Sequence, residues 1–423
     1  MSSSKRPTRR EFLIAGSAAT IAAASPALPA ELATPAEEKA ELPRSAAPWS
    51  PEELFQSGPQ RTFTGERTTQ IAMPIGGIGA GSICFNGYGG LQDFSIHTHP
   101  ETTALPAGFT SNSAEAAFAI LHIKGQTGIT KLVEGPFPPF KIFDQGLQGQ
   151  GLRRGGFEGF PRFARCTFKG EYPFGEATLT DPAIPIAVTV TAWNPFIPLD
   201  DKNSGIPCAI LEYSLHNTAA HAVDYEFSYH LSHLAPGCQP DQASTANLAI
   251  PGKGAFLTNR EAPTAESFGS AALLAFGETP RIKAMWLRSP GWEFDSLSAL
   301  WREVSTGSFT ENDGSNAVDH AGRNGASMLL AGNLAPGASR THTVLITWHF
   351  PNCYLREGGV SEDPNVKGTQ GCRTMAEGKP APWRPYYASQ WNDAREVALY
   401  IEQNCMSLRQ RTVQFKEALF SST

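Results

Sequence analysis

Short runs in which apolar and polar residues alternate follow one another along most of this chain. They are rich in β-branched and aromatic residues, and clusters of Asn, Gly and Pro separate them, which is typical of strands. Helical stretches of comparable strength do not intervene to supply parallel crossovers, so the sequence predicts an all-β fold, a large two-sheet antiparallel β-sandwich. The runs fall within residues 116–125, 162–181, 184–196, 208–218, 223–234, 270–277, 282–288 and 339–351.

Near the C-terminus the pattern changes to helical spacing, with apolar residues three, four or seven positions apart. This spacing predicts an amphipathic helix within a helical linker over residues 383–423. Its apolar stripe needs a cover, which is either the sandwich or a part that is missing. The stripe consists of Trp391, Ala394, Val397, Ile401, Cys405, Leu408, Phe415 and Leu419.

The N-terminus has the features of an export signal. "TRREFL" holds paired Arg9 and Arg10 after a hydroxyl residue, and a weakly apolar run and small residues follow. We therefore expect residues 1–30 to be a twin-arginine signal peptide, recognised by the twin-arginine export machinery, and the product to be periplasmic or extracellular. Residues 31–62 are an Ala/Pro/Glu-rich linker by composition, and residues 63–382 form the predicted sandwich domain.

The net charge limits the classes of partner, and the cysteine content bears on disulfide formation. The formal net charge is −6, with no basic block beyond the N-terminus, so no nucleic-acid partner is expected. The seven cysteines are odd in number and include no C-x-x-C pair. A chain exported in folded form cannot rely on disulfides to fold, although one late disulfide, such as Cys353–Cys372, stays open. No cofactor is predicted.

The glycine-rich stretch "MPIGGIGAGS" at residues 73–82 resembles a phosphate-binding loop but fails the spacing test. A G-x-G-x-x-G frame would need glycine where Ser82 or Cys84 stands, no βαβ unit follows, and no P-loop lysine is present. Glycines inside a strand mark bulges or places where another backbone or a ligand comes close. We therefore expect a structural role for this run.

The stretch "HTHPE" is a candidate for a metal site. His97 and His99 would face the same side of a strand, as in cupin barrels, but the acid that the cupin pattern needs is not in place. Two histidines do not close a site. His230 and His233 would point to opposite faces. No metal ligand is assigned, and a cupin-like metalloenzyme remains the third hypothesis.

Carboxylates and tryptophans supply further candidates. No G-x-S-x-G elbow supports a serine esterase, and sequence spacing cannot show which carboxylates converge in a cleft. Tryptophans can form a platform for sugars but are more often core residues. We take Asp93, His97 and Trp193 as candidates for residues near a substrate. The other carboxylates and tryptophans that can be nominated are Glu158, Asp200, Asp201, Glu212, Glu226, Trp286, Trp292 and Trp348.

Four blocks in order resemble the N-terminal region of the non-lysosomal glucosylceramidase family, glycoside hydrolase family 116. They are "MPIGGIGAGSICFNGYGGLQDFSI", the segment from "YPFGEATLTD" to "EYSLHNT", "ITWHFPN", and the closing "YIEQNCMSLRQRTVQFKEALFSST". The resemblance spans roughly residues 60–423. It implies a supersandwich-like β-sandwich that precedes an (α/α)6 barrel, in which the family's catalytic glutamate and aspartate lie.

The resemblance also sets the expected function. Because the matched blocks lead toward the barrel and do not include it, no catalytic residue is assigned. We expect the sandwich domain of a retaining β-glucosidase, inactive alone, with a separate (α/α)6 catalytic chain or domain as partner. The second hypothesis is a stand-alone carbohydrate-binding or interaction module in the periplasm, with a carbohydrate or glycolipid as ligand.

Overall fold

The computed structural model describes residues 62–98, 116–125, 128–136, 159–235, 245–286, 295–315, 324–353 and 383–421. Contacts divide the chain into a unit of residues 1–58 and a unit of residues 59–423, and every described residue belongs to the second. The predicted signal peptide, with Arg9 and Arg10, and the predicted linker up to residue 61 lie outside the described residues.

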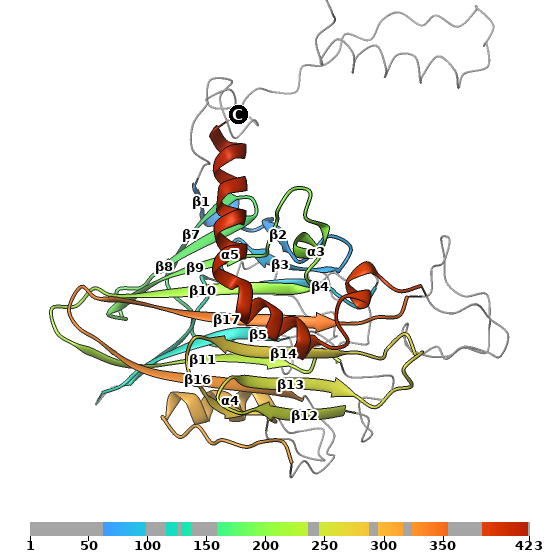
Figure 1. The fold of residues 1–423 in the computed structure, drawn as a ribbon. Coiled ribbons are helices and arrows are strands. Elements are labelled where there is room, and N and C mark those ends of the chain that lie inside the picture. The colour runs from blue at the N-terminus through green and yellow to red at the C-terminus, as the bar shows by residue number, and fades with distance from the viewer. Residues whose placement is uncertain are drawn as a thin grey trace, which may run out of the picture. The chain divides into compact units, whose positions relative to one another are not determined.

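The larger sheet is antiparallel (Figure 1). Its strands are β1 (Thr62–Thr64), β7 (Arg165–Glu171), β8 (Phe174–Thr180), β9 (Ile186–Trp193), β10 (Cys208–Asn217), β12 (Thr245–Ile250), β13 (Gly254–Asn259), β14 (Ser270–Phe276) and β17 (Ser339–His349). Within the described residues these nine strands have the order β1-β7-β8-β9-β10-β17-β14-β13-β12. Strands distant in sequence are therefore neighbours, as β10 and β17 are, with Leu211 opposite Val344.

Two smaller sheets complete the β-structure of the described residues. The five-stranded sheet has the order β15-β16-β11-β5-β6, and the three-stranded sheet the order β2-β3-β4. The former consists of β5 (Ala117–Ile123), β6 (Ile129–Leu132), β11 (Val223–Ser232), β15 (Arg281–Lys283) and β16 (Gly325–Leu334), and the latter of β2 (Ala72–Ile75), β3 (Ser82–Asn86) and β4 (Leu91–Ser95). All pairings in both sheets are antiparallel.

The described helices are α3 (Asp201–Ser204), α4 (Ser296–Ser305), α5 (Ala394–Ser421) and the 3-10 helices η2 (Gly65–Thr68) and η5 (Tyr386–Ser389). Side-chain caps fix where the two longer ones begin. The Asp295 carboxylate accepts a hydrogen bond from the Leu297 backbone N–H at the start of α4, and Asp393 accepts one from the Glu396 N–H at the start of α5. None of the described helices is both long and apolar enough to span a lipid bilayer.

The main core lies between the two larger sheets. Side chains of a strand alternate between its two faces, so every second residue of β9, such as Val188 and Val190, is buried there. Tyr225, Phe227 and Tyr229 contribute the aromatic part of the same core from β11. The predicted alternation therefore accounts directly for the packing of the sandwich.

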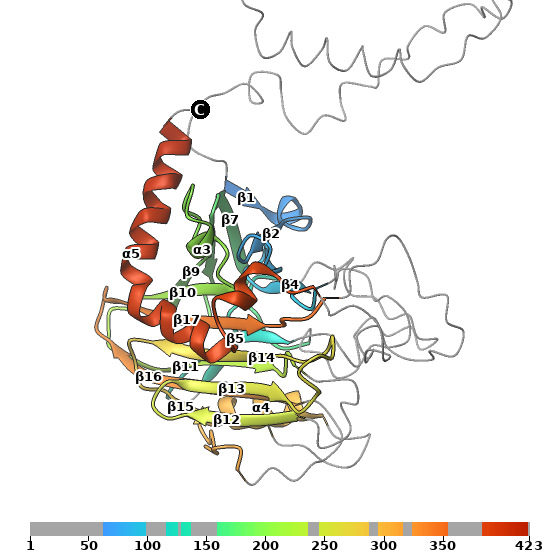
Figure 2. The same ribbon diagram turned by 45° about the vertical axis from the view of Figure 1, so that its right-hand side comes forward.

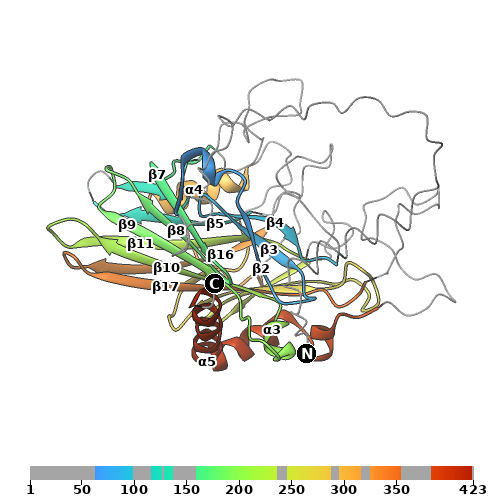
Figure 3. The same cartoon turned by 90° about the horizontal axis from the view of Figure 1, so that it is seen from above.

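A helix covers the outer face of each larger sheet. Figure 3 shows α4 and α5 on opposite sides of the sandwich. Leu297, Leu300 and Val304 of α4 pack on the five-stranded sheet. The helix α5 packs on the nine-stranded sheet and runs from the level of β14 to that of β7 (Figures 1 and 2). The outer face of that sheet is therefore buried where α5 crosses it.

The all-β sandwich and the C-terminal amphipathic helix are as predicted, and the stripe from Ala394 to Leu408 is the side that α5 buries on the sheet. Its cover is the sandwich. The three-stranded sheet and α4 were not predicted, because the runs that form them are short and interrupted by glycine or flanked by irregular segments.

Candidate functional site

The glycine run forms the turn between β2 and β3. A Cβ atom on Gly77 would lie 2.4 Å from the carbonyl carbon of Gly205, and Gly81 has φ +84°. The Ile78 backbone N–H donates to the Ser204 carbonyl at 2.8 Å. The glycines therefore let this turn lie directly against the end of α3, which is the close backbone approach that their position in a strand suggested.

Asp93 lies in β4, where the pairing with β3 shifts register. Its backbone has φ +54°, and its carboxylate accepts a hydrogen bond from Gln92 Nε2 at 2.8 Å. Burial, with a contribution from the Asp93 charge, raises the pKa of the Cys84 thiol to about 11. Asp93 is thus a partly buried carboxylate of the small sheet, with an amide partner.

His97 follows β4, and its imidazole ring is held by a hydrogen bond from one ring nitrogen and by an aromatic contact. Its Nε2 lies 2.6 Å from the Leu234 carbonyl oxygen, so the ring donates a proton there, and its centroid lies 4.4 Å from that of Phe350. His99, its expected companion, lies outside the described residues. Among the residues that the structure describes, no three His, Cys, Asp or Glu side chains gather closely enough to hold a metal ion.

Trp193, the third candidate, is completely buried at the end of β9. Its Nε1 donates to Glu212 Oε1 at 3.1 Å, and its ring stacks on Phe174 at 5.6 Å between centroids. The ring therefore offers no exposed face on which a sugar could stack, because the same cluster includes residues of α5 that cover it. Trp286 and Trp348 are buried too, and Trp292 lies outside the described residues.

The structure places a polar groove where α5 crosses the β7–β8 hairpin and β9. Arg409 of α5 binds Glu212 of β10 through two hydrogen bonds, of 2.7 and 3.0 Å, and its guanidinium lies over the Phe174 ring at 5.8 Å. Beside this pair is a cavity of about 260 Å³. Its lining residues are Lys169, Glu171, Phe174, Glu176, Thr191, Arg409, Val413 and Lys416.

Ion pairs define the charge of this groove. The Glu171 carboxylate lies between Lys169 at 2.6 Å and Lys416 at 3.2 Å. The hydrogen bond from Lys169, together with Lys416, lowers the pKa of Glu171, and the hydrogen bonds to Glu212 raise the pKa of Arg409. A retaining glycosidase needs one carboxyl whose pKa is raised so that it can donate a proton. Glu171 has the opposite shift.

Sequence reasoning missed the groove, although part of its signal was present. Lys169 and Glu171 share one face of a strand by their spacing of two, and Arg409, Val413 and Lys416 share one side of a helix by their spacings of four and three. Each of these spacings is common in strands and helices and does not by itself indicate a site. Only the packing of α5 on the hairpin brings them together, and neither spacing encodes that contact.

The end of the sandwich at which β17 terminates exposes large apolar side chains. Ile78 in the glycine turn is 65% exposed, and Leu199, which has φ +65°, is fully exposed. Trp383 and Tyr386, before and within η5, are about half exposed. We call these four residues the apolar end. The Trp348 indole ties it together by donating to the Ala80 carbonyl at 2.7 Å.

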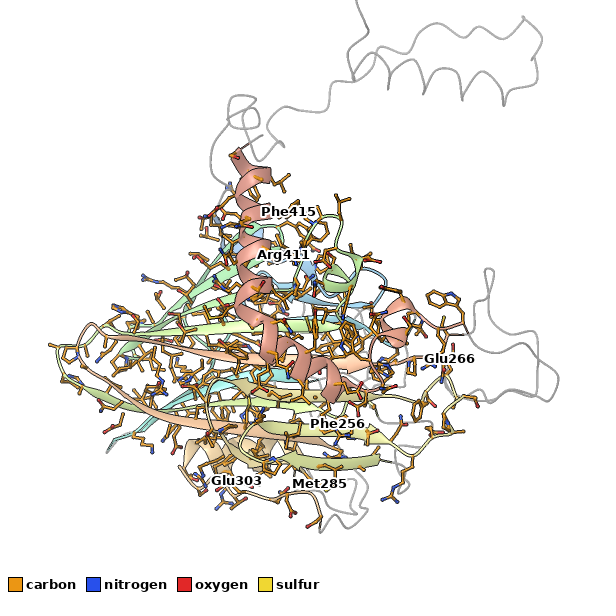
Figure 4. All side chains as sticks on the ribbon, viewed as in Figure 1. Phe256, Glu266, Met285, Glu303, Arg411 and Phe415 are labelled. Carbon is orange, nitrogen blue, oxygen red and sulfur yellow. The ribbon has the colours of Figure 1, made fainter. Side chains whose placement is uncertain are left out.

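Polar contacts join α5 to the same end of the sandwich. Arg411 binds Asp200 at 2.7 Å, and the Tyr400 hydroxyl donates to Asn203 at 2.8 Å, so the segment around α3 is held to α5. Burial alone would raise the pKa of Asp200, but the hydrogen bonds from Asn203 and Arg411 outweigh it, so this pKa is lowered. Figure 4 shows Arg411 and Phe415 on the upper half of α5, where Phe415 packs on Phe196 at 4.7 Å between centroids.

Comparisons with known structures give remote likenesses. A polysaccharide lyase is 12% identical with a TM-score of 0.28, over 70% of this chain and 34% of that one. A protein described as a kojibiose phosphorylase from the human microbiome is 9% identical with a TM-score of 0.34, over 86% and 38%. Slr1438 from Synechocystis sp. PCC 6803 is 9% identical with a TM-score of 0.30, over 70% and 98%. The chain thus spans little more than a third of the first two.

The comparison with protein families is specific. No curated protein matches the chain. The family model described as "beta-glucosidase 2, glycosyl-hydrolase family 116 N-term" matches residues 72–408, which include most of the described strands and the buried part of α5. This chain therefore belongs to glycosyl-hydrolase family 116, as its N-terminal domain.

Proposed function

We propose that this chain is the non-catalytic β-sandwich of a retaining β-glucosidase and that it acts beside an (α/α)6 catalytic domain, carried on the same or a separate polypeptide. The match of residues 72–408 to the family's N-terminal domain carries the proposal. Glu171 in the groove does not suit the role of proton donor in a retaining mechanism, because the hydrogen bond from Lys169 lowers the pKa of its carboxyl.

The apolar end is the surface that we propose to contact the catalytic domain. Isolated apolar residues on a surface are normal, but Ile78, Leu199, Trp383 and Tyr386 lie on segments that pack together at one end of the sandwich. Arg411 and Tyr400 also fix α5 to that end.

Hydrolysis of an aryl β-glucoside tests the catalytic part of the proposal. The 423-residue chain should release no aryl alcohol above the rate of a buffer blank, because both catalytic carboxylates are expected in the barrel. The chain mixed with a separately expressed family 116 barrel is the positive arm. Turnover by the chain alone would overturn the assignment.

Binding between the chain and that barrel, followed by analytical ultracentrifugation, tests the surface. Ile78→Asp and Leu199→Asp place a charge in the proposed contact and should each weaken association by about tenfold or more. Leu248→Asp is the matched control, since Leu248 is an exposed leucine on β12, at the far edge of the sheet. Unchanged affinity in both variants, or equal loss in the control, would contradict docking at the apolar end.

A further inference from the structure

The groove between α5 and the β7–β8 hairpin has room for a small ligand. Its volume is about 260 Å³, whereas one water occupies roughly 30 Å³ of the liquid. Drug-sized ligands need pockets of about 300 Å³ or more. The space therefore suits one sugar ring.

Two polar groups that line the groove have no partner among the described residues. The Glu176 carboxylate and the Thr191 hydroxyl make no hydrogen bond there, although they belong to adjacent strands and face each other in register. An ammonium group has three protons to donate, so Lys169 and Lys416 keep donors beyond those that Glu171 accepts. The groove therefore offers free acceptors and free donors side by side.

The charges around the groove balance. Lys169, Lys416 and Arg409 are cationic, and Glu171, Glu176 and the Arg409 partner Glu212 are acidic. An anionic ligand would meet the free Glu176 carboxylate, and a cationic ligand would meet the two lysines. A neutral ligand with several hydroxyl groups meets neither repulsion and can use both kinds of hydrogen-bonding group.

The groove also has an apolar part formed by Phe174 and Val413. The Phe174 ring is held in place, since it stacks on Trp193 and lies beneath Arg409 and Lys416, whose charged groups are 5.8 and 5.6 Å from its centroid. A preformed wall costs no ordering when a ligand binds. An apolar wall beside a free carboxylate, a free hydroxyl and ammonium groups that keep further donors matches a pyranose, which has C–H faces and hydroxyl edges.

We infer that this groove binds a single neutral sugar unit, at a site that shares no lining residue with the apolar end. The Glu176 carboxylate would accept hydrogen bonds from the sugar hydroxyls, and the Thr191 hydroxyl would both accept and donate them. Phe174 and Val413 would contact the ring carbons. The inference does not depend on the proposed function, because it requires no catalytic domain.

Titration of the full chain with methyl β-D-glucopyranoside, followed by calorimetry or by ligand-observed NMR, tests the inference. A small site of this kind should bind with Kd on the order of 1 mM. Glu176→Gln replaces a charged acceptor oxygen by an NH2 donor, and Thr191→Val removes the hydroxyl, so each should weaken binding by about tenfold. Val413→Trp should abolish binding by filling the cavity.

Matched controls separate the groove from the rest of the surface. Thr178 shares the outer face of β8 with Glu176, and Glu417 lies next to Lys416 on α5, yet neither lines the cavity. Thr178→Val and Glu417→Gln should bind like the parent chain. Thermal unfolding of each variant shows that it is folded. Absence of binding up to about 50 mM, binding unchanged in Val413→Trp, or binding of inorganic phosphate in place of the sugar would overturn the inference.

Discussion

His230 is the histidine whose surroundings bear most directly on stability. It is fully buried on the outer face of β11, where its Nε2 and Nδ1 lie 2.8 and 2.7 Å from the hydroxyls of Ser228 and Ser327. Burial, with a smaller effect from the cationic Lys283, lowers the pKa of His230 from 6.5 to about 3. The ring is therefore neutral in the folded protein at pH values at which an unfolded chain would protonate it.

We predict a specific pH dependence of stability from this residue. Between its unfolded pKa of 6.5 and its folded pKa of about 3, the unfolded chain binds one more proton at His230. The stability due to this group is complete above pH 6.5 and falls by about 1.4 kcal/mol for each pH unit below it. Urea unfolding at several pH values gives the slope of the free energy of unfolding against pH. Between pH 6.5 and about 3 this slope should be smaller in His230→Gln than in the parent chain, by the contribution of one proton. In His216→Gln, a change at an exposed site, the slope should equal that of the parent chain. Equal slopes in parent and His230→Gln would refute this account.

At the scale of the element, α5 is held mainly by its buried stripe. Val397, Ile401 and Leu408 are buried on the nine-stranded sheet. The ion pairs of Arg409 and Arg411 lie on side chains that are nearly half exposed, where solvent screens the charges and such pairs contribute little. Apolar burial therefore holds the helix to the sheet.

Truncation of one buried residue tests this ranking. Ile401→Ala removes apolar contacts and leaves a cavity, so it should lower the free energy of unfolding by about 2–5 kcal/mol. Met406→Ala, on the same helix but 84% exposed, should change it by less than about 0.5 kcal/mol. Urea unfolding followed by circular dichroism measures both. Similar losses in the two variants would mean that the helix does not rest on its buried stripe.

The sequence pattern also shows what local periodicity can and cannot specify. Alternation in β9 and helical spacing in α5 predicted both elements and the buried face of each. The pairing of strands could not be predicted in this way. Leu211 pairs with Val344 across a long stretch of chain, and no local period indicates such a pairing. Trp193 illustrates the consequence. Its identity suggested a sugar platform, yet α5 and Phe174 bury it, and the groove beside it depends on the packing of α5 on the hairpin.

At the scale of the whole molecule, the described cysteines bear on where the chain can fold. Cys84, Cys166, Cys208, Cys353 and Cys405 are all free thiols, buried or partly buried, whereas Cys238 and Cys372 lie outside the described residues. Burial, with a contribution from nearby acidic groups, raises the pKa of Cys166 to about 12 and that of Cys405 to about 11. Thiols of this kind react slowly. The described part of the sandwich therefore holds its cysteines as thiols, without a disulfide among them.

From the paired Arg9 and Arg10 in "TRREFL" we propose that the chain is exported already folded by the twin-arginine route to the periplasm or beyond. Arg9→Lys combined with Arg10→Lys should retain the chain in the cytoplasm, whereas Arg6→Lys, a change of the same type outside the pair, should leave export intact. Fractionation of expressing cells measures both. The retained chain should resist proteolysis as well as the exported one does, because a chain that is exported in folded form is already folded before it leaves the cytoplasm. Unchanged export of the double variant, or a retained chain that is degraded as an unfolded protein, would contradict export in folded form.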